Sequence, residues 1–177
     1  MAPNTIARNG FLLLLLFTLG TLQAQAMKPK ETHMSFYMHD LVGGRVTTGL
    51  AVAGTNGSKS NVLSFGTVTV LDNKLTERFH PRSSQVGRAQ GIYVGSALNG
   101  QSLHFVFSII FTNRRYNGST LEIQGADRLE LSKREVSVVS GTGLFRFARG
   151  FAVIERAFFD PVTLNAVLKF DVTLRHY

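Results

Sequence analysis

The sequence of 177 residues contains no cysteine and no tryptophan, and it has only four prolines. Without cysteine the chain can form neither a disulfide nor a cysteine-ligated zinc site. Its five histidines are scattered and lack metal-ligand spacing, so we expect no metal site. Gly141-Thr142-Gly143 resembles part of a nucleotide loop, but no helix and no Lys-Ser/Thr pair follow it. We therefore interpret it as a turn and expect no cofactor.

Long hydrophobic runs are also missing, apart from one short stretch near the N-terminus that is too short to span a bilayer as a helix. Arg8, the apolar run 11–17 and Ala24-Gln25-Ala26 have the pattern of a secretory signal peptide over residues 1–26. A retained N-terminal anchor is the alternative interpretation. We expect a secreted protein with no membrane anchor, in which residues 27–177 form one domain.

The charge balance is basic, with 19 Lys and Arg residues against 11 Asp and Glu residues. These basic residues are dispersed, and aromatic residues do not alternate with them as in a platform for single-stranded nucleic acid. We therefore expect no nucleic-acid partner. A positive surface would suit a polyanionic cell wall or matrix, or would simply favour solubility.

Two tripeptides match the acceptor pattern for N-glycosylation. They begin at Asn56 and Asn117, and both lie in sequence that is typical of turns. In a secreted chain, glycans at Asn56 and Asn117 are the expected consequence.

The sequence after the leader shows no helix pattern. Instead, β-branched and aromatic runs are separated by Gly, Asn, Asp and Pro, which predicts short antiparallel strands. The predicted strands cover 33–39, 46–53, 62–71, 85–96, 102–112, 120–124, 135–139, 147–157 and 166–176, with a charged loop at 72–81. Period-two alternation, clearest at 102–112 and 166–176, gives these strands two unlike faces. Eight or nine such strands allow a sandwich or a barrel, and Gly66, Gly87 and Gly91 favour bending and closure.

The stretch Ser83–Val94 is strand-like but carries Gly87 and Gly91, with Tyr93 just after them. Glycine inside a strand usually marks a bulge, a bend or a close backbone approach. Asp40 and Asp127 each follow an apolar strand, where desolvation would raise the pKa of a carboxyl group and allow it to act on a phenol or carbonyl. The alternative for both is an exposed turn aspartate.

Four motifs, in this order, resemble the signatures of the plant dirigent proteins, and the resemblance extends over nearly all of residues 27–177. They are Phe36-Tyr37-Met38-His39-Asp40, Ser84-Gln85-Val86-Gly87-Arg88-Ala89-Gln90-Gly91, Gly125-Ala126-Asp127 and Ser140-Gly141-Thr142-Gly143. The resemblance implies an all-β fold, an eight-stranded antiparallel β-barrel of the allene oxide cyclase type. It further implies secretion to the apoplast and a homotrimer.

The resemblance also implies the chemistry. Dirigent proteins bind phenolic radicals or quinone methides in the barrel lumen, and a separate laccase or peroxidase supplies the radicals. On this basis Asp40, Asp127 and Arg134 are the candidate catalytic residues, and Tyr93 is expected to stack on the substrate ring. The remaining candidate wall residues are Phe105, Phe107 and Phe170.

Three functions remain open from the sequence. The first is stereoselective guidance of phenoxy radical coupling of monolignol-type phenols, as in lignan biosynthesis. The second is a dehydrating cyclase that acts through a quinone methide, as in pterocarpan synthesis, with Asp40 or Asp127 as general acid. The third is a cell-wall-binding protein without small-molecule chemistry.

Overall fold

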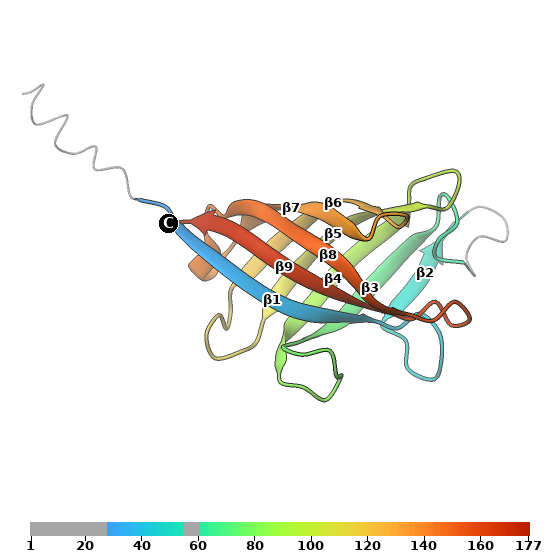
Figure 1. Cartoon of the computed structure of the whole chain (residues 1–177), viewed down its shortest axis with the longest axis horizontal. Coiled ribbons are helices and arrows are strands. Elements are labelled where there is room, and N and C mark those ends of the chain that lie inside the picture. Colours follow the sequence, from blue (N-terminus) through green and yellow to red (C-terminus); the bar gives the residue numbers. More distant parts are fainter. Residues whose placement is uncertain (1–27, 55–60) are drawn as a thin grey trace, which may run out of the picture.

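The computed structural model describes residues 28–54 and 61–177. The expected signal peptide at 1–26 and the sequon at Asn56 lie outside these ranges. Nine antiparallel strands form one continuous sheet that curls into a barrel (Figure 1). The strands are β1 Lys30–Asp40, β2 Gly49–Ala53, β3 Val68–Thr76, β4 Gln85–Gly95, β5 Ser102–Phe111, β6 Thr120–Arg128, β7 Lys133–Gly141, β8 Arg149–Phe159 and β9 Ala166–His176. A short 3₁₀ helix, η2, spans Gly143–Phe145.

The barrel closes where β1 pairs with β3. Neighbouring strands follow the order β1-β9-β8-β7-β6-β5-β4-β3-β2, and β1 also pairs with β3 through Tyr37 opposite Thr76 and His39 opposite Lys74. β1 pairs only with the C-terminal part of β3. The part of β3 before it pairs with β2, where Gly49 lies opposite Leu71. β1 and β2 therefore share one position, and the expected eight-stranded antiparallel barrel is confirmed. Within the described ranges, no helix is both long and apolar enough to cross a bilayer.

The barrel interior is filled by alternate residues of each strand, as a period of two requires. On β5 the predicted face, from Leu103 to Phe111, is buried, and the face from Leu168 to Leu174 on β9 is buried in the same way. Aromatic rings form much of this core, with Phe107 at 6.3 Å and Phe36 at 5.6 Å from the Phe170 ring centre. The predicted alternation is confirmed at both strands.

One strand differs from the prediction. We predicted a strand at 62–71 and a charged loop at 72–81, whereas β3 runs from Val68 to Thr76. Asp72 and Lys74 are charged, but they alternate with Asn73 and Leu75, which are fully buried. Residues 61–67 form a turn, so Gly66 (φ 81°) lies outside the strand.

The glycines of β4 permit a close approach to β5. Gly91 has a φ of 154° and lies opposite Phe107. A Cβ at Gly91 would lie 2.5 Å from the Val106 carbonyl oxygen and 2.6 Å from the Phe107 Cα, which is closer than real side chains allow. The β4–β5 register is unbroken from Gly87 to Gly95, so the glycine serves close packing rather than a bulge in this ladder.

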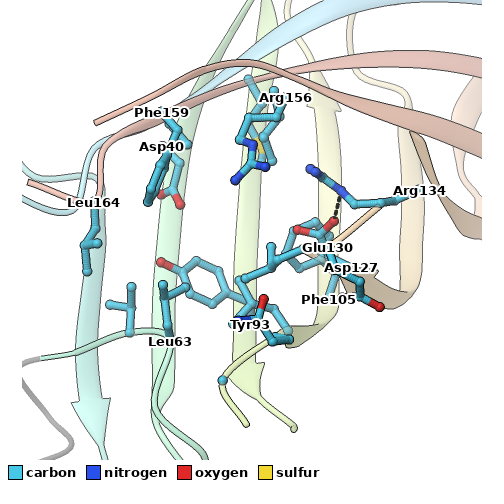
Figure 2. Close-up of a pocket in the computed structure, with 18 residues that line it drawn as sticks. Asp40, Leu63, Tyr93, Phe105, Asp127, Glu130, Arg134, Arg156, Phe159 and Leu164 are labelled. Atoms are coloured by element: carbon cyan, nitrogen blue, oxygen red, sulfur yellow. Dashed lines mark ion pairs between the residues drawn. The ribbon is translucent and has the colours of Figure 1, made fainter. Parts of the chain in front are cut away.

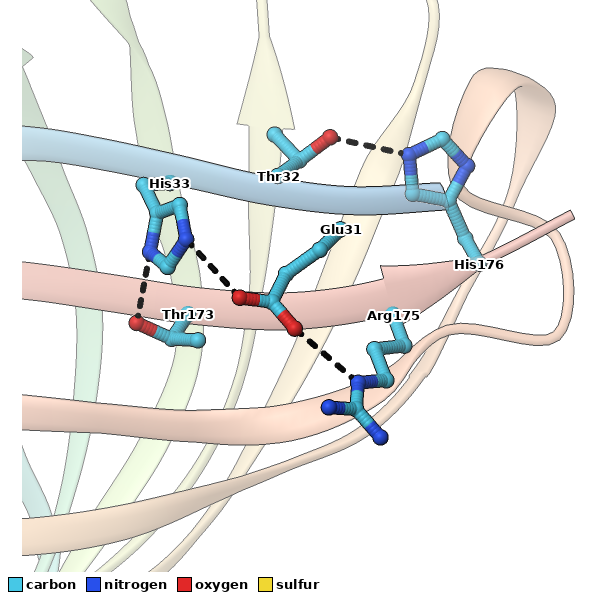
Figure 3. A network of polar contacts seen from close by, with 6 residues as sticks. All are labelled: Glu31, Thr32, His33, Thr173, Arg175 and His176. Atoms are coloured by element: carbon cyan, nitrogen blue, oxygen red, sulfur yellow. Dashed lines mark hydrogen bonds and ion pairs between the residues drawn. The ribbon is translucent and has the colours of Figure 1, made fainter. Parts of the chain in front are cut away.

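The two ends of the described chain are joined without a disulfide. β1 and β9 pair along their full lengths, from Lys30 opposite His176 to Asp40 opposite Ala166. A polar network on these strands adds to the ladder (Figure 3): Glu31 contacts His33 and Arg175, both at 3.0 Å. These groups are exposed, so each ion pair contributes little and the ladder itself holds the ends together.

Candidate functional site

A cavity of about 440 Å³ lies at one end of the barrel (Figure 2). Its lining residues Asp40 and Ala166 are paired at the end of the β1–β9 ladder opposite His176, so the cavity lies away from the C-terminus. This volume lies in the range of about 300–1,000 Å³ that small-molecule sites occupy. Its wall combines apolar side chains with a few polar groups. The lining residues are Met38, Asp40, Val62, Leu63, Tyr93, Gly100, Gln101, Leu103, Phe105, Asp127, Leu129, Glu130, Arg134, Arg156, Phe159, Leu164, Ala166 and Leu168.

Five residues expected from the sequence line this one cavity: Asp40, Tyr93, Phe105, Asp127 and Arg134 (Figure 2). They come from β1, β4, β5, β6 and β7, and closure of the barrel brings them together.

Two expected wall residues do not reach the cavity. Phe107 and Phe170 share a face with lining residues of their strands but lie deeper, in the packed core. The Phe107 ring contacts Phe105, with ring centres 5.4 Å apart. Phe107 and Phe170 therefore pack in the core beside the cavity and do not form its wall.

Asn117 lies in the loop between β5 and β6 and is exposed. This loop is at the barrel end opposite the cavity, so a glycan there would leave the cavity mouth open. Glycosylation of Asn117 stays a prediction.

Asp127 and Arg134 form an ion pair inside the wall, with 2.5 Å between Oδ1 and Nε. Their side chains are only 2% and 1% exposed. Burial raises the pKa of Asp127 above its usual value, while the adjacent Arg134 guanidinium opposes that rise. Nη1 and Nη2 of Arg134 have no hydrogen-bond partner within the described residues. A buried guanidinium with free donors at a cavity is suited to bind an oxyanion or carbonyl oxygen.

Asp40 forms a second polar group, together with Tyr93 from β4 and Asn73 from β3. The Asn73 Nδ2 donates to Asp40 Oδ1 at 3.1 Å, and the Tyr93 hydroxyl also hydrogen-bonds to the Asp40 carboxyl group. Burial nevertheless raises the pKa of Asp40 to about 6. Burial, and the negative charge of Asp40, raise the pKa of Tyr93, so this phenol stays protonated and can donate.

Several residues of the site were not predicted from the sequence. Asn73 is fully buried and is itself held by Thr48, whose hydroxyl donates to Asn73 Oδ1 at 2.6 Å. It was missed because 72–81 was taken for a loop. At Gly49, a Cβ would lie 2.9 Å from Asp40 Oδ1 and 3.4 Å from the Tyr93 hydroxyl, so this glycine leaves room for the pair.

Two charged residues at the cavity mouth, Glu130 and Arg156, were also missed. The alternation of β8 contains a signal for Arg156, because Ala152 and Ile154 are buried and the next residue of that row is Arg156. Glu130 follows the end of β6, where no alternation applies. Within the described ranges, no group of three or more His, Asp or Glu residues is arranged to hold a metal ion.

The fold and the cavity define a class of protein: a small antiparallel β-barrel with, at one end, a largely apolar cavity that carries a few polar groups and is large enough for a small molecule. Comparison with known sequences identifies the family within this class. The family model described as Dirigent-like protein matches residues 31–175, and the chain belongs to the dirigent family.

Individual relatives agree with this assignment. Dirigent protein 23 of Arabidopsis thaliana is 40% identical over 150 residues, which cover 84% of this chain and 80% of that protein. Pterocarpan synthase 1 of Glycyrrhiza echinata is 38% identical over 149 residues, covering 84% and 79%. A solved structure of a pterocarpan synthase dirigent protein superposes with a TM-score of 0.81 at 38% identity, covering 86% of this chain and 88% of that one.

Proposed function

We propose that the protein binds a phenol-derived radical in the barrel cavity and directs the stereochemistry of its coupling. The observation that carries this proposal is the buried Arg134, which borders a cavity walled by Tyr93 and Phe105 and whose Nη atoms have no hydrogen-bond partner in the described part of the chain. A flat phenolic ring suits such aromatic walls, and its oxygen suits a guanidinium donor.

The proposed reaction needs orientation more than chemical assistance. A separate laccase or peroxidase removes one electron and one proton from each phenol, and two phenoxy radicals then form one carbon–carbon bond. Because radical coupling has little intrinsic barrier, the protein need only favour one approach over the other. A difference of about 1.4 kcal/mol between two approaches gives a tenfold preference.

Asp40 supports a second candidate, a dehydrating cyclase. With a pKa of about 6, Asp40 is partly protonated near neutral pH and can act as a general acid. It would protonate a leaving hydroxyl group, which departs as water while the phenol loses its proton and becomes a quinone methide. A second hydroxyl of the same molecule would then add to that quinone methide and close the ring, with its proton passing to the quinone-methide oxygen so that the phenol is restored. The similarity to pterocarpan synthases favours keeping this candidate.

One pair of assays separates the candidates. With coniferyl alcohol and an external one-electron oxidant, radical guidance predicts dimers with an enantiomeric excess, and racemic dimers at saturating protein would contradict it for this substrate. With a hydroxy-isoflavan and no oxidant, the cyclase predicts formation of a ring and loss of water.

Tyr93→Phe should reduce whichever of these activities the protein has, because it removes the donor next to Asp40. Tyr37→Phe is the matched control, because Tyr37 packs against Phe79 and does not line the cavity.

We also propose that the protein acts in the apoplast as a homo-oligomer, the trimer expected above. An outward-facing apolar row supports association, because Leu50, Val70, Ile92 and Val106 are consecutive cross-strand partners on β2, β3, β4 and β5. Leu50 is 63% exposed, and Val70 and Val106 are each 44% exposed. A contiguous apolar face of this kind is typical of a surface that a partner covers.

A further inference from the structure

Arg156 is placed toward the barrel interior by the geometry of β8. It follows the buried Ala152 and Ile154 at intervals of two, and it lies opposite Leu168, which lines the cavity. Arg156 itself is exposed, so its guanidinium lies at the mouth and is not enclosed in the core. In Figure 2 it extends from β8 toward the space that Arg134 also borders.

Phe159 holds this guanidinium from one side. The β8–β9 register shifts between Arg156 and Phe158, and this bulge returns Phe159 to the cavity wall opposite Ala166. The Arg156 Cζ then lies 5.6 Å from the Phe159 ring centre. A guanidinium stacked on a ring keeps its in-plane N–H groups free, and these match the two oxygens of a carboxylate.

Within the described ranges, Arg156 has no ion-pair partner. Its neighbour Glu155 is paired with Lys133 at 2.9 Å on the other face of the strand. Among the other charged lining residues, Asp127 already pairs with Arg134, and Asp40 is held by Asn73 and Tyr93. Among the described residues, the charges at the mouth that have no ion-pair partner are therefore Arg156 and Glu130. Arg156 lies over the Phe159 ring, and its charge also acts to lower the pKa of Asp127.

We propose that Arg156 determines substrate choice by binding a carboxylate that the phenolic substrate carries at the end facing the cavity mouth. The inference rests on the proposed function only in so far as a phenol occupies this cavity. It names the substrate class as phenolic acids, in preference to the corresponding neutral alcohols. Glu130 disfavours the same carboxylate, so the two mouth charges together set the strength of the preference.

Binding without any oxidant tests this proposal, because no reaction is then needed. The probes are 4-hydroxy-3-methoxycinnamate and coniferyl alcohol, which share the ring and differ only in the side-chain end, carboxylate against hydroxymethyl. Equilibrium dialysis near pH 7 at low salt would give the dissociation constant of each probe. The variants are Arg156→Gln, Arg156→Lys and Glu130→Gln. Arg149→Gln is the matched control, because Arg149 is exposed near the other end of β8 and lies outside the cavity.

We expect the wild-type protein to bind the acid more tightly than the alcohol. Arg156→Gln should weaken binding of the acid about three- to tenfold and leave the alcohol within about twofold, as expected for loss of one partly exposed charge-assisted contact. Arg156→Lys should retain part of the preference, Glu130→Gln should strengthen it, and Arg149→Gln should leave it unchanged. Added salt should weaken binding of the acid and leave binding of the alcohol unchanged.

The proposed role of Arg156 would be overturned if Arg156→Gln left the preference for the acid unchanged, or if it weakened binding of both probes equally. Binding of phenols in the cavity would stand in either case. Failure of the wild-type protein to bind either probe would instead contradict binding of monolignol-type phenols in this cavity and would overturn this inference as well.

Discussion

Arg134 and Asp127 form an ion pair within the barrel wall although their side chains are only 1% and 2% exposed. Burying both charges is costly, and their attraction offsets that cost only while both are present. Because the Nη atoms of Arg134 remain without partners among the described residues, the pair supports the fold and leaves donors facing the cavity.

Removing one member of this pair should therefore destabilise the protein strongly. We expect Arg134→Met to lower the free energy of unfolding by about 3–5 kcal/mol, because it leaves the Asp127 carboxyl group buried without a countercharge. The double variant Asp127→Asn/Arg134→Met should recover most of this loss in chemical denaturation but should not recover phenol binding. Recovery of both properties would contradict a role of Arg134 in the site.

Asp40 should make stability depend on pH. Its pKa is raised from 3.8 to about 6 in the folded state, so the folded form holds this proton more tightly than the unfolded form. Its contribution is fully present below about pH 4 and is lost as the pH rises through about 6, at a cost of roughly 3 kcal/mol. As the pH rises from about 4 to about 6, the melting temperature of the wild type should fall relative to that of Asp40→Asn.

Asp160 provides a control of opposite sign for this pH experiment. Hydrogen bonds from Thr163 and from the Val162 backbone lower the pKa of Asp160, so its contribution is present above the unfolded pKa and is lost as the pH falls. Asp160→Asn should therefore reduce stability at neutral pH and leave it unchanged in acid.

For Asp40, a difference in melting temperature between the wild type and Asp40→Asn that stays constant from about pH 4 to about pH 6 would contradict burial of an ionisable Asp40.

Asn73 is a positioning residue whose loss should shift the ionisation of Asp40. Its Nδ2 donates to Asp40 Oδ1 and thereby favours the charged form. Asn73→Leu should move the pKa of Asp40 above 6, which would appear as an upward shift in the pH profile of ligand binding. Thr48→Val removes the hydrogen bond to Asn73 Oδ1 together with those to the Leu41 N–H and the His39 carbonyl oxygen, and it should shift the pKa of Asp40 in the same direction.

Gly91→Ala should disrupt packing between β4 and β5. The new Cβ would meet the backbone of Val106 and Phe107, which cannot move without breaking the ladder, so we expect a loss of more than about 3 kcal/mol. Gly118→Ala is the matched control, because Gly118 also has a positive φ of 77° but no atom lies within 4 Å of its Cβ position. It should cost only about 1 kcal/mol, measured by urea denaturation.

The outward apolar row should control assembly. Val106→Glu places a charge at the β5 end of the row, directly opposite Ile92, and sedimentation velocity should then show dissociation to monomers with the fold unchanged. Phe151→Glu is the control, because Phe151 is similarly exposed, at 40%, but lies on β8. A wild-type monomer, or equal effects of both variants, would contradict the proposed interface.

Alternation along single strands was sufficient to predict which residues of β5 and β9 share a face, and the structure buries the more apolar face of each. It failed at β3, where the charges of Asp72 and Lys74 concealed the inward Asn73 and Leu75. The predicted strands at 120–124 and 135–139 were too short for the same reason. Asp127 and Arg134 lie within β6 and β7, because the barrel ladder extends strands through polar sequence. The alternative of an exposed turn aspartate is therefore wrong for Asp127, which is 1% exposed.

The sequence by itself indicated the all-β class and the two unlike faces of the regular strands, and its resemblance to dirigent proteins pointed to Asp40, Tyr93, Phe105, Asp127 and Arg134, which line the cavity. Only the tertiary structure decided how deep each residue lies. Phe105 and Phe107 share a face of β5, yet only Phe105 reaches the cavity. Depth depends on register between strands, and register depends on pairings such as β1 with β3 and β9, between segments far apart in the chain. A local period of two carries no information on those pairings, so the cavity appears only when the barrel closes.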